Sequence, residues 1–183
     1  MHTFIAHLSQ SVFHFNRNLL LAGALLAAAP TITSCAKQNK PQDAAAATAE
    51  SDSIEARQMA KEEAFLAQKA KEPGVQSLGG GLLYKVLRAG KGAQPTSTSM
   101  VTVDYEGKLI DGTIFDSSYQ RGESANFPVS GVVPGWQITL KAMHEGDEWE
   151  VYIPQYLGYG ANASGNIPPY STLIFKIALK SVD

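Results

Sequence analysis

The segment Val132-Val133-Pro134-Gly135-Trp136 forms the centre of the stretch that decides the fold, residues 101–175. Pro134 and Gly135 are typical of a helix start, which places Trp136, one of two tryptophans, in the first helical turn. Several aromatic and β-branched residues flank it in the sequence: Tyr105, Phe115, Phe127, Val133, Tyr159 and Phe175. Polar Asp116 and Arg121 are interleaved with them. This mixture fits either the core of a small β domain or an apolar ligand pocket with a few placed polar groups.

Alternating apolar and polar residues around this centre predict antiparallel strands. In residues 101–107, Val101, Val103 and Tyr105 share one face. Asp111-Gly112 predicts a hairpin turn, because this pair tolerates a positive φ. We also expect strands at residues 82–88, 148–154 and 173–182, a short helix at 136–143, and loops at 119–127 and 155–169. The expected fold is therefore α+β, with a curved antiparallel sheet of four to five strands wrapped around one short helix.

Composition excludes several classes of function. The 183 residues carry a net charge of −2 with scattered Lys and Arg, which argues against nucleic acid as a partner. The single cysteine, Cys35, allows no intramolecular disulfide. Three of the four histidines fall within the first 14 residues, so the sequence predicts no metal site in the folded part. It gives no sign of a bound cofactor either.

Residues 1–35 have the pattern of an export signal. Arg17 is followed by an apolar run of about eleven residues. A run of this length is too short to span a bilayer comfortably and is typical of a signal peptide. Ile32-Thr33-Ser34-Cys35 resembles a bacterial lipobox, in which the cysteine becomes the first mature residue and carries lipid. The alternative is a plain signal peptide with an incidental cysteine. We expect an exported protein in the cell envelope, held to a membrane by lipid on Cys35 and facing the periplasm.

A tether and a helix are expected between the leader and the main domain. Residues 36–50 lack a periodic apolar face and predict a flexible tether. Residues 51–73 are rich in helix formers, with Asp52 and Glu55 as a capping box and Pro73-Gly74 as the stop. Two interpretations of this helix stay open. It is either a solvated helix that packs Phe65 and Leu66 on the domain, or a helix through which the chain forms a homodimer.

Five motifs in this order give the sequence a specific family resemblance. They are Val103-Asp104-Tyr105-Glu106-Gly107, Asp111-Gly112-Thr113-Ile114-Phe115-Asp116-Ser117-Ser118, the Trp136 segment, Tyr159-Gly160, and Ile167-Pro168-Pro169-Tyr170-Ser171-Thr172-Leu173-Ile174-Phe175. Residues 78–183 resemble the FK506-binding (FKBP-type) peptidyl-prolyl cis-trans isomerases. The helical lead-in and the leader resemble the exported forms of Gram-negative bacteria, including the macrophage infectivity potentiator-like group.

The resemblance implies roles for individual residues. Trp136 matches the pocket floor, and three aromatic residues match walls around a proline ring: Tyr105, Phe115 and Phe175. The backbone N–H of Val133 and the hydroxyl of Tyr159 match groups that bind ligand carbonyls. Asp116 matches the catalytic aspartate, and Arg121 its ion-pair partner. Val132, Ile167 and Phe127 match further substrate-binding positions. The expected partners are proline-containing polypeptides and FK506-like macrolides.

The sequence departs from the family pattern in two loops. The stretch between Arg121 and Val132 is about two residues shorter than in the compact human form, and Ala125 falls near a position that is often aromatic. The loop at residues 161–166 is also shorter, with polar Asn166 where an apolar residue is common. Two further hypotheses remain beside an isomerase for exported proteins. One is a chaperone that holds unfolded chains in the same cleft, and the other is a surface interaction protein.

Overall fold

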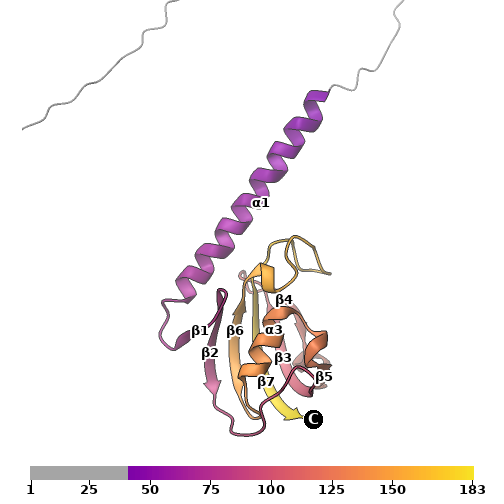
Figure 1. Ribbon diagram of the computed structural model, residues 1–183. Helices are drawn as coiled ribbons and strands as arrows, with labels where there is room; N and C mark the ends of the chain where they lie inside the picture. Colours follow the sequence, from indigo (N-terminus) through magenta and orange to yellow (C-terminus); the bar gives the residue numbers. More distant parts are fainter. Residues whose placement is uncertain (1–40) are drawn as a thin grey trace, which may run out of the picture. The chain divides into compact units, whose positions relative to one another are not determined.

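The computed structural model describes residues 41–183 (Figure 1), so the expected leader with Cys35 and residues 36–40 of the expected tether lie outside the described residues. The helices are α1 (Pro41–Lys69), α2 (Ser118–Arg121) and α3 (Pro134–Ala142), with short 3-10 helices η1 (Val129–Gly131) and η2 (Gln155–Leu157). The strands are β1 (Val75–Gly79), β2 (Leu82–Arg88), β3 (Met100–Lys108), β4 (Ile114–Ser117), β5 (Ala125–Pro128), β6 (Glu148–Ile153) and β7 (Leu173–Val182).

The strands form one antiparallel sheet in the order β1-β2-β6-β7-β3-β4, with β5 also paired to β3. The α+β class and the curved sheet around α3 are confirmed, but the sheet has seven strands where four to five were expected. The two unexpected strands are β1, and β5 within the expected loop 119–127. Both are short, and the register with a neighbouring strand, rather than an apolar alternation of their own, defines them.

Helix α3 covers one face of the sheet, which we call the inner face (Figure 1). Its Leu140 is fully buried with residues of the central strands, among them Val103, Ile177 and Leu179. Gly135 allows this close approach, because a Cβ there would come within 3.0 Å of the Ile153 Cδ1 atom on β6. The PGW segment thus places Trp136 directly against the sheet, where it is 4% exposed.

The outer face of the sheet carries a smaller core. Leu83, Tyr152 and Ile174 point to this face, and Phe65 and Leu66 of α1 pack against them. The Phe65 and Tyr152 rings meet with centroids 6.2 Å apart. This is the packing expected of a solvated helix, with one side against the domain.

Helix α1 begins earlier than expected. Residues 41–50 were assigned to the tether, but they belong to the helix, and Asp52 and Glu55 lie inside it rather than forming its capping box. Pro41 at the first helical position and the run of alanines at residues 44–47 explain the difference, since proline suits that position and alanine has the highest helix propensity. In the described part of the chain, no helix is both long and apolar enough to cross a membrane.

Candidate functional site

A cavity of about 630 Å³ opens on the inner face, beside the start of α3. Its walls come from β3, β4, β5, β7, α3, the segment before α3 and the loop that precedes β7. The lining residues are Tyr105, Phe115, Asp116, Phe127, Gly131, Val132, Val133, Trp136, Tyr159, Ser164, Gly165, Asn166, Ile167 and Phe175. Residues from seven separate segments therefore converge on a space of the size that small ligands occupy.

Trp136 lies at the centre of the aromatic lining. Its ring is nearly perpendicular to those of Tyr105, Phe175 and Phe127, with centroid distances of 5.3, 5.2 and 5.9 Å. Edge-to-face pairs at these distances are favourable beyond the burial of their area. The rings hold one another in place, so the apolar wall is formed before any ligand arrives.

Phe115 reaches the cavity from the hairpin because β3 has a glycine opposite it. Gly107 pairs with Phe175 on one side and with Asp116 on the other. A Cβ at Gly107 would lie 2.6 Å from the Phe115 Cζ atom and 2.7 Å from the Phe175 Cε1 atom. The missing side chain leaves room for these two rings, which meet edge to face at 5.4 Å.

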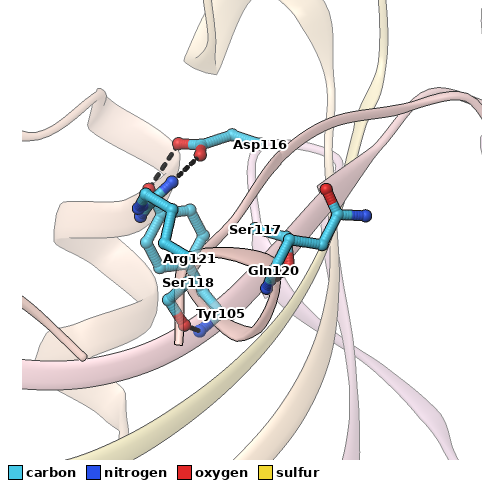
Figure 2. A network of polar contacts seen from close by, with 6 residues as sticks. All are labelled: Tyr105, Asp116, Ser117, Ser118, Gln120 and Arg121. Atoms are coloured by element: carbon cyan, nitrogen blue, oxygen red, sulfur yellow. Dashed lines mark hydrogen bonds and ion pairs between the residues drawn. The ribbon is translucent and has the colours of Figure 1, made fainter. Parts of the chain in front are cut away.

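Tyr105, Asp116 and Arg121 form a polar network (Figure 2), of which Tyr105 and Asp116 line the cavity. The Asp116 carboxylate accepts hydrogen bonds from the Tyr105 hydroxyl and the Arg121 guanidinium. Arg121 also donates to the Tyr105 hydroxyl at 3.1 Å, and its Cζ atom lies 5.5 Å from the centroid of that ring. Asp116 and Arg121 are five residues apart in the sequence, and the single turn of α2 brings their side chains together. The predicted ion pair is therefore present.

The network changes the acidity of its members. Partial burial acts to raise the pKa of the Asp116 carboxyl, but the hydrogen bonds from Tyr105 and Arg121 outweigh it and leave the pKa below its ordinary value. Burial, together with the bond to Asp116, raises the pKa of Tyr105. At neutral pH the site thus holds an ionised carboxylate beside a protonated phenol.

Two serines perform the local capping that Asp116 could otherwise have performed. Ser117 is the N-cap of α2 and accepts from the Gln120 N–H at 3.3 Å. The Ser118 hydroxyl accepts from the Tyr105 N–H at 2.8 Å (Figure 2). The Asp116 side chain points instead toward the Tyr105 hydroxyl and the Arg121 guanidinium, which leaves its carboxylate at the cavity.

Two backbone segments complete the wall. The segment before α3 carries Val132 and Val133, and the Gln137 amide holds it by donating to the Val132 carbonyl at 2.8 Å. The loop before β7 carries Tyr159 and Ile167. Ile167 is 5% exposed, and its backbone exchanges hydrogen bonds of 2.9 and 3.0 Å with Ser164.

The structure brings the residues singled out from the sequence together, with Arg121 behind Asp116 rather than on the cavity lining. Cys35 lies outside the described residues. Sequence reasoning did not assign Gly131, Ser164, Gly165 or Asn166 to the lining. Small or polar loop residues carry no periodic signal, so the length of the long loop was the main indication in the sequence that this loop belongs to a functional site. Within residues 41–183, no group of three or more His, Cys, Asp or Glu side chains is placed to hold a metal ion.

Comparison with known proteins identifies the family. The family model of the FKBP-type peptidyl-prolyl cis-trans isomerases matches residues 91–180. The family model of the domain amino terminal to this isomerase matches residues 5–86. The peptidyl-prolyl cis-trans isomerase Mip of Coxiella burnetii is 52% identical over 123 residues, which cover 67% of this chain and 54% of the relative. The outer membrane protein MIP of Legionella longbeachae is 49% identical over 124 residues, which cover 67% and 53%.

A solved structure extends the likeness to the fold. The crystal structure of FkpA from Escherichia coli matches with a TM-score of 0.66 and 38% identity, over 82% of this chain and 75% of that one. The chain spans just over half the length of the two curated relatives. Two family models and these alignments lead to one conclusion: the chain belongs to the family of FKBP-type peptidyl-prolyl cis-trans isomerases.

Proposed function

We propose that this chain catalyses the cis-trans isomerisation of X-Pro peptide bonds in proline-containing polypeptides, during the folding of exported proteins. The observation that carries the proposal is the preformed aromatic cavity around Trp136 with an ionised Asp116 at its rim. The name of the Coxiella relative, peptidyl-prolyl cis-trans isomerase Mip, supports it.

The reaction requires rotation about a bond and no nucleophile. Rotation about the prolyl amide has a barrier of about 18–20 kcal/mol, because resonance gives the C–N bond partial double-bond character. The twisted amide has lost that resonance and is less dipolar than either planar isomer. A dry aromatic cavity therefore disfavours the planar ground states more than the twisted state, which is the differential binding that catalysis needs. Trp136 would form the floor under the proline ring, with Tyr105, Phe115, Phe127 and Phe175 around it.

Polar groups at the rim would orient the amide and stabilise its twisted form. Asp116 would face the carbonyl carbon of the residue before proline, and its hydrogen bonds with Tyr105 and Arg121 would fix its orientation. The Tyr159 hydroxyl and the Val133 N–H would bind carbonyl groups of the substrate. Such preorganised groups do not have to reorient during the reaction, as solvent dipoles would. Val132 and Ile167 would supply apolar contact beside them.

Isomer exchange measured by NMR on a short X-Pro peptide tests this function. We expect the full chain to accelerate exchange, and Asp116→Ala to lower the acceleration about ten- to hundredfold through the loss of a preorganised electrostatic group. Glu123→Ala is the matched control, since it removes an exposed carboxylate close to Arg121 but outside the cavity lining. A folded chain that does not accelerate exchange would refute the proposal and favour a cleft that only holds unfolded chains.

The same cavity is a candidate site for FK506-like macrolides, because these ligands would occupy the apolar space around Trp136. Inhibition of X-Pro peptide exchange by a macrolide would show that both molecules bind in this cavity. Binding of the macrolide without loss of peptide exchange would place it elsewhere.

We also propose that the chain is exported and held to a membrane through lipid on Cys35, facing the periplasm. The lipobox-like sequence at residues 32–35 supports this location, as does the name of the Legionella relative, outer membrane protein MIP. Metabolic labelling with a radioactive fatty acid should mark the wild-type chain and leave Cys35→Ser unlabelled. Equal labelling of both would refute the anchor.

A homodimer through the N-terminal helix is the remaining partner proposal. Ile54 and Met59 of α1 are 58% and 39% exposed, which leaves apolar surface available on this helix. Sedimentation of the wild-type chain and of the Ile54→Asp variant tests this proposal. We expect the wild type to sediment as a dimer and the variant as a monomer. A wild-type monomer would refute it.

A further inference from the structure

A second cavity, of about 550 Å³, lies between α1 and the outer face of the sheet. Its lining residues are Met59, Glu62, Glu63, Leu66, Ala67, Ala70, Gly81, Leu83, Pro154, Gln155, Tyr156 and Thr172. Most of these side chains are aliphatic, small or exposed. Glu62 differs from them because its carboxylate is buried.

Glu62 is 4% exposed, although it belongs to a helix with a largely exposed surface. One carboxylate oxygen accepts the backbone N–H of Thr172 at 2.9 Å, and the other accepts the Gln58 side-chain amide at 2.6 Å. A buried carboxylate is costly unless hydrogen bonds compensate it. Each of its oxygens is engaged in this way, and the bond to Thr172 joins α1 to a segment 110 residues later in the chain.

Thr172 is the last residue of the loop that forms one wall of the inner cavity. The loop runs from residue 154 to residue 172 and carries Tyr159 and Ile167. Strand β7 starts at the next residue, and Phe175 follows two residues further on. Thr172 is 1% exposed, and its N–H has the Glu62 carboxylate as its partner, so removal of the carboxylate would break the bond that fixes this end of the loop.

A second contact between α1 and the same loop lies two helical turns before Glu62. Glu55 accepts a hydrogen bond from the Tyr170 hydroxyl at 3.0 Å. Tyr170 has a φ of 59°, a conformation that costs energy for a residue with a side chain. Its N–H donates to the Gly160 carbonyl at 2.7 Å, next to Tyr159. The strained end of the loop is thus held on one side by α1 and on the other by the turn that carries Tyr159.

We infer that Glu62 is a positioning residue for the inner cavity: by accepting the Thr172 N–H it fixes the end of the 154–172 loop, and so the placement of Tyr159 and Ile167 against the substrate. The inference rests on the proposed isomerase function and extends it, because it makes the seating of α1 on the outer face a determinant of activity on the inner face. Glu62 touches no reacting atom in this account.

Three variants of the full chain test the role. Glu62→Ala removes the acceptor, Glu62→Gln keeps an oxygen that can accept the Thr172 N–H, and Glu63→Ala removes an exposed carboxylate from the adjacent position. We expect Glu62→Ala to lower kcat/KM for an X-Pro peptide roughly three- to tenfold, the scale on which remote positions modulate coupled sites. Glu62→Gln should restore most of the loss, and Glu63→Ala should match the wild type.

The backbone amide resonances of Tyr159 and Ile167 provide the second measurement, which loss of stability alone would not move in a folded sample. They should shift in Glu62→Ala and stay in place in Glu63→Ala. Wild-type activity and resonances in Glu62→Ala would overturn the inference, as would a loss of the same size in Glu62→Gln or in Glu63→Ala. If the wild-type chain does not accelerate exchange, the isomerase proposal fails separately, and the two resonances still decide whether Glu62 holds the wall.

Discussion

The inner cavity and the outer cavity are close in volume, about 630 and 550 Å³, but different kinds of residue line them. The inner one has aromatic rings that contact one another edge to face, and a carboxylate at its rim. The outer one is lined by aliphatic and small residues together with polar ones and a single aromatic residue, Tyr156, and its buried carboxylate already accepts two hydrogen bonds. Volume alone therefore does not distinguish the two cavities as candidate sites. The mutual packing of the rings and the ionised carboxylate at the rim are what support the proposed function of the inner one.

The first prediction compares the stability that each face provides. Trp136→Ala should lower the free energy of unfolding by about 3–5 kcal/mol, because it removes a large buried ring from the central core. Phe65→Ala, which removes a half-buried ring from α1, should cost about 1–2 kcal/mol. Urea unfolding of both variants gives the numbers. Equal losses would mean that the outer core is as important to the fold as the inner one.

The second prediction separates activity from stability. Phe115 lies on the inner cavity at an accessible edge, so Phe115→Ala should lower kcat/KM by roughly ten- to hundredfold through poorer placement of the prolyl amide. Phe65→Ala should change kcat/KM much less. The assay is peptide exchange at a temperature where both variants remain folded. A larger loss of activity in Phe65→Ala than in Phe115→Ala would reverse the comparison.

The third prediction concerns the network at the rim. Tyr105→Phe keeps the ring but removes the hydroxyl that donates to Asp116. Its stability should fall by about 1 kcal/mol, the usual net value of one hydrogen bond. Its activity should fall severalfold, less than in Asp116→Ala, because Arg121 still holds the carboxylate. An activity below that of Asp116→Ala would show that the hydroxyl itself acts on the substrate.

The smallest expected effect is the dependence of stability on pH. The pKa of Asp116 is lowered on folding, so its contribution to stability is present above the pKa of the unfolded chain, about 4, and is lost as the pH falls through the lower folded value. The pair with Arg121 is partly exposed, so the contribution should stay below about 1 kcal/mol. Unfolding at pH 7 and at pH 3 would show it as a smaller loss in Asp116→Asn than in the wild type. A larger loss in the variant would contradict the sign.

The sequence predicted the elements that carry their own signal. Residues 173–182 alternate apolar faces and form β7 with those bounds, and the Asp111-Gly112 pair marks the β3–β4 hairpin, with Gly112 at a φ of 87°. Strands β1 and β5 escaped prediction because both are short, and their pairing with β2 and β3 defines them rather than an apolar alternation of their own. The expected start of α1 was wrong because Asp52 and Glu55 have the spacing of a capping box, whereas the preceding alanines favour helix and extend it back to Pro41.

The candidate site likewise has a part that the sequence predicted and a part that it did not. The aromatic residues and the spacing of Asp116 and Arg121 could be recognised from motifs, and the structure brings them together. Glu62 could not be recognised, because a glutamate in a charged helix is ordinarily solvated. Its burial depends on the seating of α1 beside Thr172, a contact between residues 110 positions apart. Tertiary contacts of this kind leave no local pattern in the sequence.

The two tryptophans allow the most direct test of the central claim, that the inner cavity binds and isomerises the X-Pro bond. Trp136 lines this cavity, whereas Trp149 is buried against Tyr84 with ring centroids 4.4 Å apart and does not line it. The measurement is a titration of the full chain with a short X-Pro peptide, following both indole N–H resonances and the exchange rate of the peptide. We expect the Trp136 resonance to shift, the Trp149 resonance to stay, and exchange to accelerate with the same dependence on concentration. Accelerated exchange with an unmoved Trp136 resonance would contradict it.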